Sequence, residues 1–202
     1  MSIATYADLK ASVANYLNRS DLTSIIPDLI TLAEARLNAD LRARDMEART
    51  SLSATAGNAY VTLPTDMLEM QRLAISSIDP MRVLKYLSAD ELATDYPSSS
   101  GGMPAVFAII GAQIQLAPIP DSDYTLELSY QQRVPALSDT NSSNWLLSAW
   151  PNAYLYATLC EAQPFLMNDA RLQVFQALYQ QAVDGINQVN WYSGSTMRVK
   201  TR

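Results

Sequence analysis

The sequence contains no histidine and only one cysteine in 202 residues. Histidine is the commonest general base and metal ligand in proteins, so its absence argues against most hydrolytic and zinc-dependent chemistry. The single Cys160 permits no internal disulfide, which is typical of proteins that fold in a reducing compartment. We therefore expect no catalytic residue, no cofactor and no metal site.

Long apolar runs are also absent. No run approaches the roughly 20 residues that cross a bilayer. The opening MSIATYADLK has neither the basic start nor the apolar stretch of a secretory signal. We expect a protein that assembles in a cytoplasm and has no membrane partner.

Charged residues are scarce, at 17% of the chain against a usual figure of roughly 25%. A surface so poor in charge is expected to be covered in part by protein partners. The net charge of −6 argues against a free-standing binder of duplex DNA, which needs a basic surface. An acidic protein can still form a passive wall beside DNA.

Few side chains could carry chemistry. Cys160 lies among apolar residues of a predicted helix and has no histidine as base, so we expect it to be inert. Asp121 and Asp123 occupy a proline-rich connection, where acids are commonly turn formers. Three serines lack the glycine elbow of hydrolases, namely Ser53, Ser148 and Ser193. A hydrolase remains an alternative if Asp121, Asp123 or Glu127 faces a groove with a raised pKa.

The centre of the chain has the two-residue period of β-strands. Residues 104–130 read PAVFAIIGAQIQLAPIPDSDYTLELSY, and Gly111 can supply the positive φ of a tight turn. We predict three antiparallel strands there, joined by short turns. A second hairpin is predicted over residues 50–63, with further strands over 70–78 and 82–87.

Two helices are predicted before residue 48. Thr5 and Asp8 are spaced as a capping box, and this helix should end near Arg19. Pro27 suits the first position of the second helix. The apolar stripes of the pair contain Leu9, Val13, Tyr16, Leu17, Leu29, Ile30, Leu32, Ala33, Leu37 and Leu41. The charged residues predicted to form a solvated face of the second helix are Glu34, Arg36, Asp40, Arg42 and Arg44.

Further helices are predicted later in the chain. Ser88 begins a capping box and a short helix. A longer helix starts at Pro151, and Pro164 should kink or end it. The last helix starts at Asp169 and contains Gly185, which indicates a close packing contact because glycine is costly inside a helix.

Together these elements predict an α+β fold. The N- and C-terminal helix pairs, residues 1–48 and 144–192, would pack as a four-helix bundle. An antiparallel β-rich lobe is inserted at 49–143, and residues 193–202 form an extended C-terminal arm. Its bases alternate with apolar residues, a pattern typical of a strand that docks on another chain. The residues concerned are Met197, Arg198, Val199, Lys200 and Arg202.

Several segments resemble the head-to-tail adaptor proteins of tailed bacteriophages, also called head completion or connector proteins, of the tail tubular protein A type. Each motif is unspecific alone, but their order and spacing are shared over nearly the whole chain. They are YADL at 6–9, DLITLAEARL at 28–37, LRARDME at 41–47, YVTLPTDMLE at 60–69, PAVFAIIG at 104–111, IQLAPIPD at 114–121, and NWLL at 144–147 followed by Pro151 and YLYATLCEA at 154–162.

The resemblance implies a structural virion protein without catalytic activity. It implies a ring, typically dodecameric, in the neck between capsid and tail, assembled in the host cytoplasm. The partners would be the portal protein, a tail nozzle or other tail protein, and genomic DNA passing through the channel. Residues 195–202 would be the portal-docking segment. Another neck or tail component, such as a nozzle or terminator, and a tail-associated hydrolase remain the alternatives.

Overall fold

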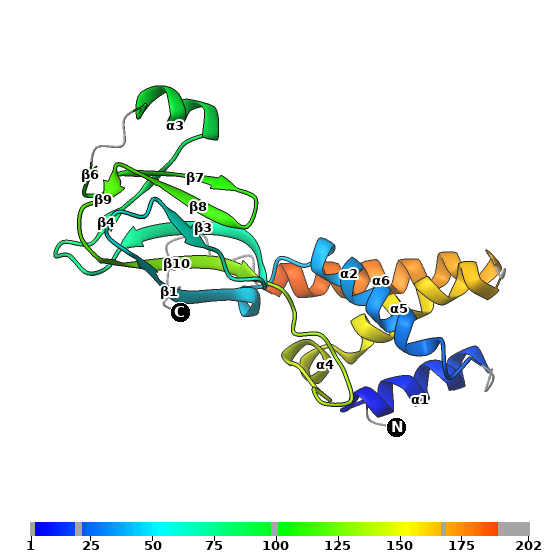
Figure 1. Ribbon diagram of the computed structural model, residues 1–202. Helices are drawn as coiled ribbons and strands as arrows, with labels where there is room; N and C mark the ends of the chain where they lie inside the picture. Colours follow the sequence, from blue (N-terminus) through cyan, green and yellow to red (C-terminus); the bar gives the residue numbers. More distant parts are fainter. Residues whose placement is uncertain (1–2, 19–21, 98–100, 167–168, 190–202) are drawn as a thin grey trace, which may run out of the picture. The chain divides into compact units, whose positions relative to one another are not determined.

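The computed structural model describes residues 3–18, 22–97, 101–166 and 169–189 (Figure 1). The chain forms two compact units, one from residues 1–46 with 134–202 and one from residues 47–133. We call them the helical unit and the β unit. The first contains helices and the second contains the strands, so the predicted α+β class is confirmed.

The helical unit is organised around α5, Pro151–Leu166. It contacts α1 (Tyr6–Leu17), α2 (Ile26–Asp40), α4 (Trp145–Ala149) and α6 (Asp169–Val189). A short 3-10 turn, η1 at Arg44–Met46, follows α2. The buried side chains that fill the space between these helices include Leu9, Val13, Ile30, Ala33, Leu37, Tyr154, Leu159 and Ile186.

Local sequence signals set the ends of these helices. At α1, Thr5 accepts a hydrogen bond from the Asp8 N–H and the Asp8 carboxylate accepts one from the Thr5 N–H, so the predicted capping box is confirmed. The helix ends at Asn18, which has a φ of 53°. Pro27 lies in the first turn of α2 but not at its first position as predicted, because the helix begins one residue earlier, at Ile26.

The structure corrects several predictions about the helices. Tyr16 and Leu32 are not buried, since 51% and 54% of their surfaces are exposed. Glu34 does not belong to a solvated face, because it lies in the core. The short helix α4 was not predicted, and α5 ends at Leu166, two residues beyond Pro164.

Gly185 also differs from the prediction. A Cβ at this position would meet no described atom within 4 Å outside the local helix backbone. No close packing contact explains the glycine in this part of the chain.

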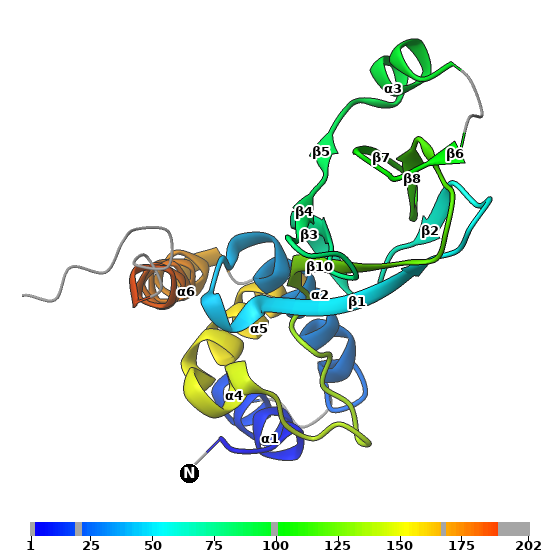
Figure 2. The same ribbon diagram turned by 90° about the vertical axis from the view of Figure 1, so that its left-hand side faces the viewer.

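The β unit contains two four-stranded sheets and a short two-stranded one. The first sheet has the order β1-β10-β3-β4, and the second has the order β2-β8-β7-β5. Figure 2 shows β10 and β3 along one side of the unit, with β7 and β8 on the other. The strands are β1 (Glu47–Ala54), β2 (Tyr60–Thr62), β3 (Met67–Ile75), β4 (Arg82–Val83), β5 (Lys85–Tyr86), β6 (Gly101–Gly102), β7 (Val106–Ile110), β8 (Gln113–Ala117), β9 (Ile119–Pro120) and β10 (Tyr124–Gln132).

One core holds the two larger sheets together. The buried side chains come from both sheets and include Leu73, Ile75, Phe107, Ile114, Leu116, Leu126 and Leu128. Leu84, between β4 and β5, is also in this core, and there the chain passes from the first sheet to the second. The predicted helix after Ser88 is confirmed as α3 (Ala89–Asp95), and its Leu92 packs with Val106 and Ala108 in a smaller cluster.

The predicted strand pairing is correct for one hairpin and wrong elsewhere. The strands β7 and β8 pair antiparallel around Gly111, whose φ is +60°. The third strand of the predicted set, β10, pairs with β1 and β3 in the other sheet. The hairpin predicted over residues 50–63 is also wrong, because β1 pairs with β10 while β2 pairs with β8. The alternation of apolar and polar residues predicts a strand but not the strand with which it pairs. The partner is selected by the packing of the two sheets against each other.

Candidate functional site

The candidate catalytic groups have structural partners. Cys160 is buried, and burial raises the pKa of its thiol, which disfavours the thiolate a nucleophile requires. The Tyr124 O–H donates to Asp121 at 2.7 Å, and this bond lowers the pKa of that carboxyl. Asp123 accepts from the Ala56 N–H at 2.8 Å, and Glu127 pairs with Arg72 at 3.1 Å. These contacts are those of turns and cross-strand pairs.

The two serine candidates within the described residues, Ser53 and Ser148, also have no catalytic setting. Ser53 is exposed on β1. The Ser148 O–H donates to the Asn144 carbonyl at 2.9 Å, as is common in helices. Ser193 lies outside the described residues. Over the part of the chain that the structure describes, no group of three acidic or cysteine side chains could hold a metal ion, and no helix is long and apolar enough to cross a membrane.

A buried polar cluster in the helical unit surrounds Glu34 of α2. The Leu137 N–H donates to its carboxylate at 2.7 Å, and the Tyr154 O–H donates to the same oxygen at 3.3 Å. Burial raises the pKa of Glu34, because removal from water disfavours its charged form. Burial and the nearby Glu34 also raise the pKa of Tyr154, so this phenol remains a hydrogen-bond donor.

Asn144 extends this cluster to the start of α4. Its amide donates to the Tyr154 hydroxyl oxygen and to the Pro135 carbonyl, both at 2.7 Å. Its side-chain carbonyl accepts from the Leu147 N–H at 2.8 Å and so caps α4. One side chain therefore joins α5, α4 and the segment that precedes them.

This cluster fixes the return segment, which we define as residues 134–144. The segment has little regular structure, but α2 also binds it through Asn38, which accepts from the Val134 N–H at 2.8 Å. From α1, the Tyr6 N–H donates to the Ser142 carbonyl at 2.7 Å, and Lys10 pairs with Asp139 at 2.9 Å. Three helices thus hold the chain where it enters the C-terminal half of the helical unit.

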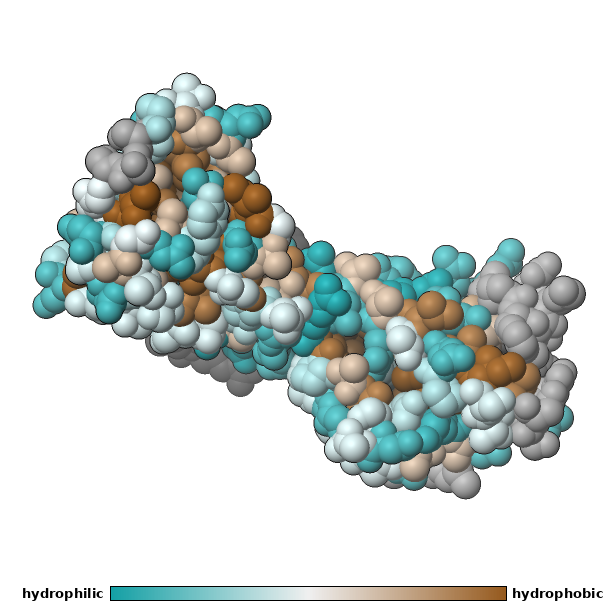
Figure 3. Space-filling model, viewed as in Figure 1, coloured by the Kyte–Doolittle hydropathy of each residue, from teal (hydrophilic) through white to brown (hydrophobic). Residues whose placement is uncertain are grey.

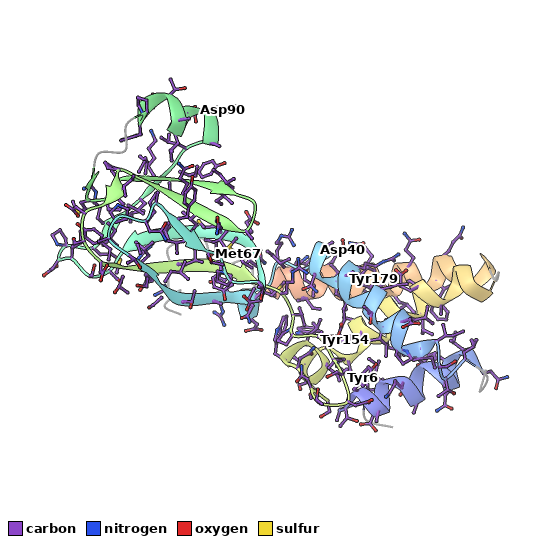
Figure 4. The ribbon with its side chains drawn as sticks, in the orientation of Figure 1. Tyr6, Asp40, Met67, Asp90, Tyr154 and Tyr179 are labelled. Atoms are coloured by element: carbon purple, nitrogen blue, oxygen red, sulfur yellow. The ribbon has the colours of Figure 1, made fainter. Side chains whose placement is uncertain are left out.

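A second polar group attaches α6 to α2. The Tyr179 O–H donates to Asp40 at 2.6 Å, and Figure 4 shows the two side chains close together. Asn187 donates to the Asp40 carbonyl at 3.2 Å and accepts from the Arg42 N–H at 2.9 Å. These bonds satisfy backbone groups at the C-terminal end of α2, which would otherwise need water.

Two of the arginines predicted to be solvated also have structural roles. Arg36 pairs with Glu161 of α5 at 2.7 Å, and its guanidinium lies 5.7 Å from the centre of the Tyr179 ring. Arg42 donates to the carbonyls of Ala39 and Leu41 at 3.0 and 2.6 Å. These bonds place the positive charge of Arg42 at the C-terminal end of α2, where it interacts favourably with the helix dipole.

An apolar groove lies in the described part of the β unit. Its volume is about 460 Å³, and it lies between the first half of β3 on one side and β5 and β7 on the other. It is lined by Met67, Leu68, Glu69, Met70, Gln71, Tyr86, Phe107 and Ile109. Tyr86 is 58% exposed and meets the ring of Phe107 edge-on, with 5.7 Å between the ring centres. Such a surface suits a polypeptide partner better than a reacting substrate, because only Glu69 brings a charge to it.

The sequence pointed to only part of this arrangement. The proposed docking residues Met197, Arg198, Val199, Lys200 and Arg202 lie outside the described residues. Glu34 was misassigned, although its position four residues after Ile30 and three before Leu37 places it on the apolar face of α2. That spacing was the available signal. No local signal identified the groove, because it forms between strands that are distant in sequence.

Comparison with known families gives one extended match. The family model described as SU10 adaptor protein matches residues 4–200. Comparison with curated proteins gives no match. The family match covers both units and continues through most of the C-terminal segment.

Proposed function

Because the chain belongs to the SU10 adaptor protein family, a family of phage head-to-tail adaptors, we propose that it forms a ring that joins the portal to the tail. A protein of this family is a structural component of the virion neck. The observation that carries the proposal is the extent of the match, which runs over residues 4–200 and so includes both units. We propose a dodecamer with the genome passing through its central channel.

The surface composition supports an assembled ring. A cyclic ring is built by heterologous contacts, in which two different patches of the same chain meet. Large apolar side chains that are at least half exposed lie on several elements, and they are Tyr16, Leu32, Val83, Tyr86 and Val174. Contacts of α5 with α1, α2 and α6 support a bundle of the terminal helix pairs as the body of each subunit.

The charge supports a channel that does not retain DNA. The net charge is −6, and residues 47–133 carry ten acidic and five basic side chains. An acidic wall repels phosphates and favours passage over binding. Contact with the genome in this proposal is therefore passive.

The portal contact is assigned to residues 195–202. This segment has three basic residues and no acid, and Met197 and Val199 alternate with Arg198 and Lys200. Such an alternation suits addition as a strand, in which backbone hydrogen bonds provide affinity and every second side chain enters a pocket. A tail nozzle or another tail protein would bind the opposite face of the ring.

Truncation after residue 194 tests this assignment. We expect the truncated protein to lose co-sedimentation with the portal from the same genome, while its unfolding transition stays unchanged. Replacement of Arg198, Lys200 and Arg202 by Glu should have the same effect. The matched control R198K/R202K keeps the charge and should bind as the full chain does. Undiminished portal binding by the truncated protein would refute the docking role of this segment.

A further inference from the structure

Two strand edges in the β unit have no neighbouring strand among the described residues. In the first sheet, β4 pairs with β3 only at Ala74 and Ile75, so residues 67–72 of β3 pair with β10 alone. In the second sheet, β5 pairs with β7 only at Val106 and Phe107, so residues 108–110 of β7 pair with β8 alone. An unpaired edge offers backbone N–H and C=O groups to a further strand.

The apolar groove lies between these two edges. Met67, Met70 and Ile109 line it together with Phe107 and Tyr86. Figure 3 shows hydrophobic surface at the end of β7 and the turn that follows it, and Ile109 and Ile110 there are 37% and 44% exposed. The groove therefore combines free backbone edges with side chains that gain from being covered, which is the combination that binds an extended strand.

The chain contains one segment of matching length and chemistry. The other gaps between described residues contain only two or three residues each, whereas residues 190–202 number thirteen. Of these stretches, residues 190–202 alone are long enough to cover the six residues of the β3 edge. In an added strand Met197 and Val199 would share one face, toward the groove, and Arg198 and Lys200 the other. The bases on the outer face would complement the acid excess of residues 47–133 as a whole.

We propose that, in protein that has not yet met a portal, residues 195–202 of one copy bind as a strand in this groove of a second copy. The choice of a second copy rests on the proposed ring, because arm and groove are different patches and their contact is heterologous. The binding of residues 195–202 in the groove can be tested whether or not the same residues also dock on the portal. The segment must leave the groove to reach the portal, so the two acceptors compete for it.

The test compares two neighbouring isoleucines of β7 in the full-length chain. Ile109 lines the groove, whereas Ile110 does not, and both are part-exposed. We expect sedimentation velocity to show concentration-dependent association of the wild type. Ile109→Lys should weaken it at least tenfold, because it removes apolar contact and repels the basic segment. Ile110→Lys should associate as the wild type does. Thermal unfolding of both variants verifies that the fold is kept.

A synthetic peptide of residues 190–202 tests the occupant directly. In excess it should convert the associated wild type to monomer, whereas a peptide with Met197 and Val199 replaced by Asp should not. A wild type that stays monomeric at all concentrations, equal behaviour of the two lysine variants, or no effect of the peptide would each overturn the proposal. Portal binding of the wild type, measured separately, distinguishes this failure from that of the proposed function. A wild type that does not bind the portal refutes the proposed function alone.

Discussion

Replacement of Tyr154 by Phe isolates the contribution of one buried hydroxyl to the helical unit. Tyr154 is fully buried, and its O–H joins Glu34 to Asn144. The substitution keeps the ring and its packing. It removes the O–H bond to the Glu34 carboxylate and leaves one Asn144 N–H without its acceptor.

The expected cost follows from these two losses. A hydrogen bond to a charged group contributes about 1.5–3 kcal/mol, and a buried donor left unpaired costs about 1–3 kcal/mol. The two effects share a site and do not add fully, so we expect the free energy of unfolding to fall by about 2–4 kcal/mol. That is a large part of the roughly 5–15 kcal/mol that stabilises an ordinary domain.

Tyr179→Phe is the matched control. Its hydroxyl donates to Asp40 at 2.6 Å, but this bond is only part-buried and water can replace the lost partner. We expect a cost of about 1 kcal/mol. Urea unfolding followed by tryptophan fluorescence measures both variants, since Trp145 and Trp150 lie in the helical unit. A cost below about 1 kcal/mol for Tyr154→Phe, or a greater cost for Tyr179→Phe, would refute this reasoning.

Three further predictions test single groups. The pKa of Glu34 is raised above its ordinary value of 4.5 in the folded state, so its contribution to stability is present at low pH and is lost as pH rises through the folded pKa. Glu34→Gln should remove this part of the pH dependence. Parallel pH profiles of the unfolding free energy for wild type and variant would contradict this expectation. Gly185→Ala should stabilise the free protein by about 1 kcal/mol in thermal unfolding, because alanine is favoured over glycine inside a helix and the added methyl group meets no described atom within 4 Å outside the local helix backbone. Destabilisation would indicate that Gly185 is required for a close contact. Ser88→Ala should lower the free energy of unfolding by about 1 kcal/mol, because it removes the capping box of α3, while Ser53→Ala at an exposed position of β1 should leave it unchanged. Equal effects of the two variants in urea unfolding would contradict the capping role of Ser88.

Local signals predicted the elements that depend on neighbouring residues. The capping boxes at Thr5 and Ser88 and the turn at Gly111 require only residues within four positions, and all three are present. The helical spacing of Ile30, Ala33 and Leu37 predicted their burial for the same reason.

Features that depend on distant residues were not predicted. The pairing of β10 with β1 and β3 is decided by which sheets can bury Leu126 and Leu128 together, and the two-residue period contains no information on the partner. Burial of Glu34 requires donors from Leu137 and Tyr154, which lie about a hundred residues away. The groove likewise lies where the short strands β4 and β5 leave one edge of β3 and one edge of β7 without a described neighbouring strand.

Electron microscopy of the purified protein mixed with the portal protein from its own genome tests whether the chain forms the proposed ring. We expect rings of this chain stacked coaxially on the portal, with their copy number visible in end views. Portal particles without added density, at concentrations where the chain is in excess, would contradict it.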